Sequence, residues 1–247
     1  MKKNLLFITI SLFCCISFCC CSSNNRSYSY AQNSSDCQTI QRTETVPSYE
    51  IIAELDDSSR TMLTGKGFRT IMLGKYGSIM VPGYLFPADS HTKSNIATKT
   101  NKYIEDNFSE SVYYEIGNLL EHSDKKRYAT FSSNFTSADG YQILTEDDMQ
   151  YDSEMDEYLK EALTDGVRQS GWSIIKWYPY DYPLVCGHRV MRLHYVRSGQ
   201  ATPVEVFIYS FDVSDGVVTL TFSCRQDEFL DNTLEDFSKS LSTIRIK

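Results

Sequence analysis

The chain has 247 residues, of which 41% are hydrophobic, so it can bury a sizeable core and disorder of the whole is excluded. Residues 1–31 hold three basic residues and no acids; without them 21 basic and 32 acidic residues remain, a net charge of −11. This balance excludes a nucleic-acid partner, because phosphates require a basic surface.

The N-terminus has the order of an export signal. Lys2 and Lys3 precede an apolar run over residues 5–21, and a polar stretch begins at Ser22. The apolar run is too short for a membrane span. We therefore expect the folded part to lie outside the cytoplasm, in the cell envelope or secreted.

Two processing routes remain open for this signal. Cleavage after Ser29-Tyr30-Ala31 would release a soluble protein. Alternatively, the end of the apolar run resembles a bacterial lipoprotein signal, in which Cys20 or Cys21 would be lipidated. The second route would attach the protein to a membrane only through its N-terminal lipid.

After the export signal, assigned to residues 1–31, residues 32–67 are predicted to be a tether and a poorly defined N-terminal segment. The tether is rich in Ser, Asn, Gln and Thr and cannot bury enough surface to order itself. Residues 48–55 form an edge strand or a short helix. Residues 68–247 are expected to form a single domain.

The first half of this domain is predicted to be mainly strands. Residues 68–73 and 76–81 form a hairpin around Gly74-Lys75, a pair suited to a type II′ turn. The polar stretch that contains His91, Lys93 and Asn95 is expected to be a long surface loop. Strands are expected at residues 111–116 and 127–133.

Acidic residues dominate the segment from Glu146 to Tyr158, but it has no glycine at the position that a calcium-binding EF-hand loop needs. We interpret the acids as the N-terminal part of a helix, where they complement the helix dipole. The helix is predicted at residues 152–169, because its apolar residues recur every three or four positions. Gly171 is suited to end it.

The C-terminal block is predicted to be a four-stranded meander at residues 172–178, 185–196, 204–213 and 217–224, followed by a helix at 232–242 and a short strand. The third strand has apolar residues on both faces, so both faces are covered. In such a meander Cys186 and Cys224 lie at opposite ends of the sheet, and they are not expected to pair. The fold class is α+β: an antiparallel β-sheet flanked by helices on both faces.

This order of elements resembles the fold of PsbP, the photosystem II extrinsic protein, of the Ran-binding protein Mog1, and of DcrB-type bacterial envelope proteins. The resembling residues are a hairpin ending in Met80-Val81-Pro82-Gly83-Tyr84, the mid-chain helix, and the meander with its final helix and strand. The resemblance implies an α/β/α sandwich that serves as a binding or assembly module. It brings no catalytic residues with it, and fold similarity leaves the function open.

Two sets of residues are candidates for a site. Cys186, His188, Arg192 and His194 fall on even positions of one predicted strand and would share a face, as a thiol–imidazole or metal pair requires; ordinary strand positions are the favoured interpretation. The second set is an aromatic stretch interrupted by prolines, whose rings could contact a protein or a sugar. Its members are Trp177, Tyr178, Tyr180 and Tyr182, of which Tyr180 and Tyr182 are expected to be exposed.

We therefore predict a non-catalytic extracytoplasmic module that binds a protein or glycan of the cell envelope. The alternative is a hydrolase or metal-binding site built on Cys186, His188 and His194. The sequence has no nucleophile elbow, phosphate-binding glycine loop or His-Glu-x-x-His pair, and no cofactor is expected.

Overall fold

The computed structural model describes residues 50–107, 112–124, 127–227 and 229–247. The predictions for the export signal, for Cys20 and Cys21 and for the tether concern residues outside these ranges. Within these ranges, every helix is too short or too polar to span a lipid bilayer.

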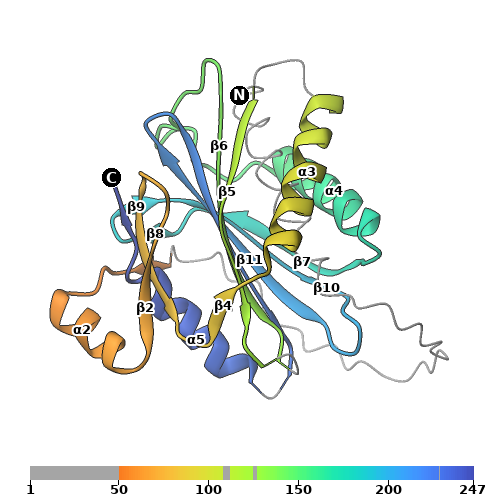
Figure 1. Ribbon diagram of the computed structural model, residues 1–247. Helices are drawn as coiled ribbons and strands as arrows, with labels where there is room; N and C mark the ends of the chain where they lie inside the picture. Colours follow the sequence, from red (N-terminus) through yellow and green to blue (C-terminus); the bar gives the residue numbers. More distant parts are fainter. Residues whose placement is uncertain (1–49, 108–111, 125–126, 228) are drawn as a thin grey trace, which may run out of the picture.

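A seven-stranded antiparallel sheet forms the centre of the fold, in the order β4-β5-β6-β12-β11-β10-β7 (Figure 1). The strands are β4 (Leu85–Pro87), β5 (Val112–His122), β6 (Ala129–Ala138), β7 (Ile174–Asp181), β10 (Met191–Arg197), β11 (Val204–Val213) and β12 (Gly216–Arg225). Strands β7, β10, β11 and β12 form the predicted meander, and β11 has the predicted bounds. Pairing of β12 with β6 joins the two halves of the sheet.

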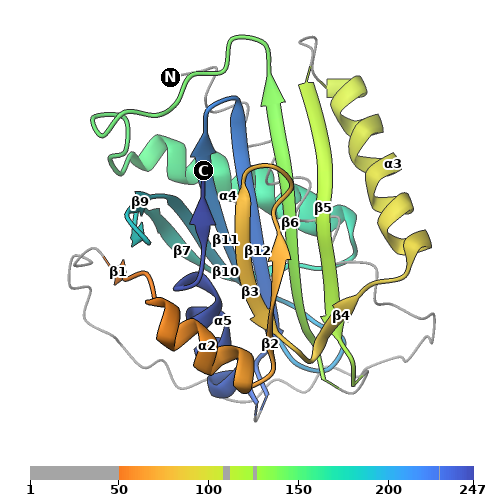
Figure 2. The same cartoon turned by 60° about the vertical axis from the view of Figure 1, so that its left-hand side comes forward.

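Helices cover both faces of this sheet (Figure 2), which confirms the predicted α+β class. Helices α3 (Ser90–Asn107) and α4 (Ser153–Gln169) lie on one face, which we call the α3/α4 face. Helix α5 (Leu230–Leu241) lies on the other, the α5 face, together with two small sheets. Side chains of β11 point alternately to the two faces and so contribute to both cores. Val206 and Ile208 pack under α4, whereas Tyr209 and Phe211 belong to the core under α5.

The small sheets add short strands on the α5 face. One has the order β13-β3-β2 and the other β1-β8-β9, with β1 parallel to β8. Their strands are β1 (Ile51–Ile52), β2 (Phe68–Met72), β3 (Gly77–Pro82), β8 (Leu184–Val185), β9 (His188–Arg189) and β13 (Arg245–Ile246). Helix α2 (Asp57–Gly65) packs on β2 through Leu63. Strand β1 and helix α2 thus lie within the segment that the sequence leaves poorly defined.

Hairpin β2–β3 forms as predicted. The Tyr76 N–H donates to the Leu73 carbonyl at 3.2 Å, so Gly74 and Lys75 are the central residues of the turn. Gly74 has φ +60°, whereas Lys75 is not in the positive-φ region, as a type II′ turn requires.

Helix α4 is also found where the sequence places it. Asp152 caps its N-terminus by accepting hydrogen bonds from the N–H groups of Glu154 and Met155. Gly171 has φ +82° just beyond its C-terminus. Helix α5, in contrast, begins at Leu230, two residues before the predicted start, and no side chain caps it.

The predicted surface loop that contains His91, Lys93 and Asn95 is wrong, because these residues lie in α3. Asp89 begins the helix by accepting a hydrogen bond from the Thr92 N–H at 2.8 Å. The helix was missed because the side chains that it buries are few: Ile96, Thr100 and Ile104 on one side of an otherwise polar segment.

The predicted strand over residues 185–196 is also wrong. A tight hairpin interrupts it: Val185 pairs with His188, and Cys186 and Gly187 form the turn between β8 and β9. Both turn residues have positive φ, +48° for Cys186 and +82° for Gly187. Gly187 is the local turn signal here, but cysteine is uncommon in this conformation, so the Cys-Gly pair does not read as a typical turn.

Candidate functional site

The structure separates the four polar candidates. Cys186 and His188 flank Gly187 in the turn, whereas Arg192 and His194 lie on β10. The Cys186 thiol donates to the Leu241 carbonyl at 3.3 Å, and the His188 ring packs edge-on near Phe211. The expectation that all four share one strand face is therefore wrong. Within the described ranges, no group of three His, Cys, Asp or Glu side chains is arranged to hold a metal ion.

The environment of Cys186 is unfavourable for a thiolate. Burial raises the pKa of Cys186 to about 11, and the nearby Glu54 carboxylate acts in the same direction. Cys186 and Cys224 are both free thiols, which confirms that they do not pair with each other. Burial likewise raises the pKa of Cys224, to about 12.

Cys186 is expected to react with iodoacetamide at pH 8 about 100-fold more slowly than a free cysteine, because only the thiolate attacks and its fraction falls tenfold per pKa unit. Mass spectrometry of the time course measures this rate, and the urea-unfolded protein is the control. Reaction at the rate of a free cysteine would contradict the raised pKa and favour a reactive thiol.

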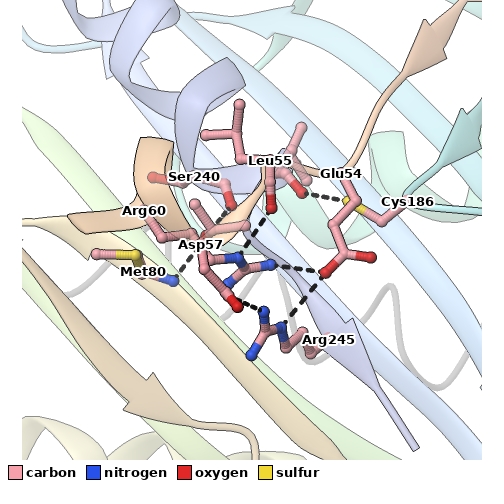
Figure 3. A network of polar contacts seen from close by, with 10 residues as sticks. Glu54, Leu55, Asp57, Arg60, Met80, Cys186, Ser240 and Arg245 are labelled. Carbon is pink, nitrogen blue, oxygen red and sulfur yellow. Dashed lines mark hydrogen bonds and ion pairs between the residues drawn. The ribbon is translucent and has the colours of Figure 1, made fainter. Parts of the chain in front are cut away.

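The Cys186 turn adjoins a polar network on the α5 face (Figure 3). Glu54 accepts hydrogen bonds from Arg60 at 3.0 Å and Arg245 at 3.3 Å, and Arg245 also donates to Asp57 at 2.8 Å. These contacts join the start of α2 to the C-terminal strand β13. Because Glu54, Asp57 and Arg245 are largely exposed, each ion pair contributes little to stability.

His194 lies in a stack of rings across β7, β10 and β11. Its ring is nearly parallel to that of Tyr178, with centroids 3.9 Å apart, and stacks on Phe207 at 4.2 Å. Its Nε2 is 2.6 Å from Glu205 Oε2, and Gln226 donates to the other carboxylate oxygen of Glu205 at 2.7 Å. Both ring faces of His194 are therefore covered. Although burial alone would raise it, these hydrogen bonds hold the pKa of Glu205 below its usual value.

Replacing Glu205 with glutamine is expected to lower the free energy of unfolding by about 1–2 kcal/mol at pH 6. Since the pKa of Glu205 is lower in the folded state, its stabilisation is complete above the unfolded pKa of about 4.3 and is lost as the pH falls through the folded value. Urea titrations should show the gap between the two proteins closing below about pH 4. A gap that stays unchanged down to pH 3 would rule out this account.

The aromatic candidates are mostly internal. Tyr180 and Tyr182 are 3% and 5% exposed, so the expectation that they are exposed is wrong. The Tyr180 hydroxyl accepts from the Asp152 N–H at 2.7 Å and so holds the start of α4. The Trp177 indole N–H donates to the buried Asp156 carboxylate. These side chains fix α4 to β7, and Tyr178 belongs to the ring stack of His194.

A different feature stands out in the two central strands, β6 and β12. Their side chains on the α5 face are mainly apolar and include Phe131, Phe135, Leu220 and Phe222. On the α3/α4 face the same strands carry a set of polar side chains, each at most 3% exposed, that we call the polar stripe. It consists of Ser132, Asn134, Thr136, Thr219, Thr221 and Ser223.

The polar stripe runs between two helices that pack on other strands. Helix α3 packs on β5 through Ile96, which contacts Ile116 and Leu119. Helix α4 packs on the opposite half of the sheet through Leu159 and Leu163. Within the described residues neither helix packs extensively on β6 or β12. The helices therefore flank the stripe (Figures 1 and 2).

Two hydroxyl groups, one in the stripe and one on α3, are buried without a partner among the described residues. Thr219, on the floor of the stripe, and Thr100, on the inner side of α3, are both 0% exposed. Neither Oγ1 atom has a hydrogen-bond partner in the part of the chain that the structure describes. Leaving a buried hydroxyl unpaired costs about 1–3 kcal/mol, which the nearly isosteric valine would avoid.

The ends of the stripe are marked by tyrosines. Tyr114 is the cross-strand neighbour of Thr136 at one end. At the other end, Ser223 is 2.6 Å from the hydroxyl of Thr130 and 3.5 Å from that of Tyr128. Tyr128 also accepts a hydrogen bond from Arg197 at 3.0 Å. The six side chains of the stripe are themselves uncharged.

Sequence reasoning missed the polar stripe, although a signal for it exists. Residues 217–224 alternate strictly after Val217, with Thr219, Thr221 and Ser223 between apolar residues. Such alternation is typical of a strand with one solvated face. Only the structure shows that this polar face is buried and lies on the side that carries α3 and α4.

Comparison with known proteins gives distant structural likeness alone. No family model matches the chain, and no curated protein matches it. The structure of LpqN, a protein involved in cell envelope biogenesis of Mycobacterium tuberculosis, aligns with a TM-score of 0.35 and 9% identity, covering 60% of this chain and 96% of LpqN. The Pseudomonas aeruginosa protein PA94, a putative regulator of unknown function, aligns with a TM-score of 0.29 and 11% identity, covering 70% and 94%. Neither is described as PsbP, Mog1 or DcrB, so that resemblance stays a prediction.

Proposed function

We propose that this protein is a non-catalytic binding module that works outside the cytoplasm, in the cell envelope, and that its ligand lies against the polar stripe. One observation carries the proposal: the hydroxyl of Thr219, within the stripe, is fully buried and has no partner among the described residues, and the same holds for that of Thr100 on α3. A ligand with polar groups would supply the missing hydrogen bonds.

The polar surroundings support a binding role. The Thr219 hydroxyl can both donate and accept a hydrogen bond, and the packed helices on either side hold the strands in place. The alternative, a hydrolase or metal site on Cys186, His188 and His194, is not favoured, because Cys186 and His188 lie at the β8–β9 turn whereas His194 lies on β10 with Tyr178 and Phe207 on its two ring faces. The partner remains a protein or glycan of the envelope.

The export signal suggests the location. Its lipoprotein-like end makes Cys20 or Cys21 the proposed point of attachment, and cleavage after Ala31 is the alternative. Mass spectrometry of the N-terminus of the exported protein distinguishes the two. A lipidated cysteine as the first residue supports attachment; an unmodified N-terminus at Gln32 supports release.

The proposed function is tested by the thermal unfolding of the purified protein in fractions of envelope extract. A ligand that binds the folded state raises Tm with concentration. We expect at least one fraction to raise Tm for the wild type and for Thr98→Val, a change on the outer side of α3, but not for Thr219→Val. If no fraction raises the Tm of the wild type, or if Thr219→Val responds equally, the proposal is wrong.

A further inference from the structure

We infer that the segment Glu50–Glu54 is a detachable strap, which covers the turn at Cys186 and opens while the rest of the domain stays folded. The inference is independent of the polar stripe, because the strap lies on the α5 face. It follows from how few contacts hold the strap, from the partners that its neighbours keep when it leaves, and from what it covers.

Few contacts hold the strap on the domain. The Glu50 carbonyl accepts a hydrogen bond from the Leu184 N–H at 3.0 Å, and the Ile52 carbonyl accepts one from the Cys186 N–H at 2.8 Å. Ile52 is the one buried side chain of the strap, at 8% exposed, whereas Ile51 is 70% exposed. A segment with so few buried contacts opens at a lower free energy than the core of a domain.

The first charged residue of the strap binds an arginine that has another partner. Glu50 pairs with Arg192, and Arg192 also donates two hydrogen bonds to Asp181, at 2.8 and 2.6 Å. When the strap leaves, the half-buried Arg192 therefore keeps a carboxylate partner. Opening does not leave this charge unpaired, which would be costly.

Glu54, at the other end of the strap, is bound in the same way (Figure 3). It accepts hydrogen bonds from Arg60 and Arg245. Arg245 also donates to Asp57, and Arg60 also donates to the Leu55 carbonyl at 3.1 Å. Neither Asp57 nor Leu55 belongs to the strap, so both arginines keep a partner after it opens.

Leu55 is the fixed end of the strap. Its N–H donates to the Ser242 carbonyl at 2.8 Å. Its side chain packs on the cluster of Leu63, Phe68 and Met80, which joins α2 to β2 and β3. The chain can therefore open over Glu50–Glu54 and remain attached to the domain at Leu55.

The strap covers the edge of β8 and the turn that follows it. Strand β8 pairs with β9 on one side and with β1, which is part of the strap, on the other. Opening therefore leaves β8 with a free edge. It also removes the Glu54 carboxylate, whose charge raises the pKa of Cys186. The thiol becomes both more accessible and easier to ionise, and the thiolate is its nucleophilic form.

Iodoacetamide labelling of the folded protein at pH 8 tests the strap, with peptide mass spectrometry to follow Cys186. Ile52→Ala is expected to accelerate this labelling about tenfold or more, because it removes most of the apolar surface that the strap buries. Ile51→Ala, the same substitution at an exposed position, should leave the rate within about twofold. If Ile52→Ala leaves the Cys186 rate unchanged, the strap does not control access to the thiol and the inference is wrong.

A second variant separates opening of the strap from unfolding of the domain. Asp156→Ala removes the contacts of α4 with Trp177 and the Tyr180 N–H, on the other face of the sheet. Labelling of Cys224, which is 1% exposed in the core, requires wider unfolding, so this variant should accelerate it about tenfold or more. The rate at Cys186 should stay unchanged. Equal acceleration of both thiols would show that the strap opens only with the domain and would overturn the inference.

Discussion

Replacing Asp156 with alanine is expected to lower the free energy of unfolding by about 3 kcal/mol. The carboxylate is 7% exposed and accepts hydrogen bonds from the Trp177 indole and from the Tyr180 N–H. Its removal leaves the buried Tyr180 N–H and the half-buried Trp177 indole N–H without this acceptor and loosens the contact between α4 and β7. Urea denaturation at pH 7 measures the change.

The matched control is Asp165→Ala on the same helix. Asp165 is exposed and pairs with Arg168 at 2.9 Å, an exposed ion pair, so its loss should cost less than about 0.5 kcal/mol. Asp156→Asn should fall between the two variants, because the amide keeps one acceptor oxygen. If the two alanine variants are equally stable, Asp156 does not hold α4 in place.

Unlike Asp156→Ala, Thr219→Val is expected to stabilise the protein. In the absence of ligand it should raise the free energy of unfolding by about 1 kcal/mol. Valine keeps the shape of threonine, and the hydroxyl that it removes is buried without a partner among the described residues. Stability would then increase while ligand binding falls. This combination distinguishes a binding residue from a structural one.

Thr243→Val provides the comparison for this result. Thr243 is also 0% exposed, but its hydroxyl accepts from the Met80 N–H at 2.8 Å and donates to the Ser240 carbonyl at 2.6 Å. The same substitution there should lower the free energy of unfolding by about 2 kcal/mol. If Thr219→Val destabilises the protein as much as Thr243→Val, the Thr219 hydroxyl has a structural partner.

The sequence predicts the strands with strong alternation and the helices with a regular apolar stripe. Strand β11 and helix α4 lie where it places them, because local pattern and tertiary burial agree there. Helix α3 was missed because only a few of its side chains are buried. The turn at Cys186 was not predicted because cysteine seldom adopts positive φ, and Gly187 alone is compatible with a bulge inside a strand.

The candidate site was less predictable than the fold. Period-two patterns show that β12 has a polar side, but they do not show which side carries the helices. That depends on the positions of α3 and α4, which the long-range order of strands determines. Likewise, Tyr180 and Tyr182 have the composition of a recognition loop, yet contacts with α4 and the core bury them. Composition alone does not distinguish an exposed aromatic loop from one that is buried under a helix.

The parallel pairing of β1 with β8 places the start of the described chain on the α5 face. Residue 50, where the described chain begins, lies on the α5 face, and Glu50 binds Arg192 there. The polar stripe lies on the opposite face of the central sheet. The first described residue and the polar stripe therefore lie on opposite faces of the central sheet, so contacts made at Glu50 leave the stripe face unaffected.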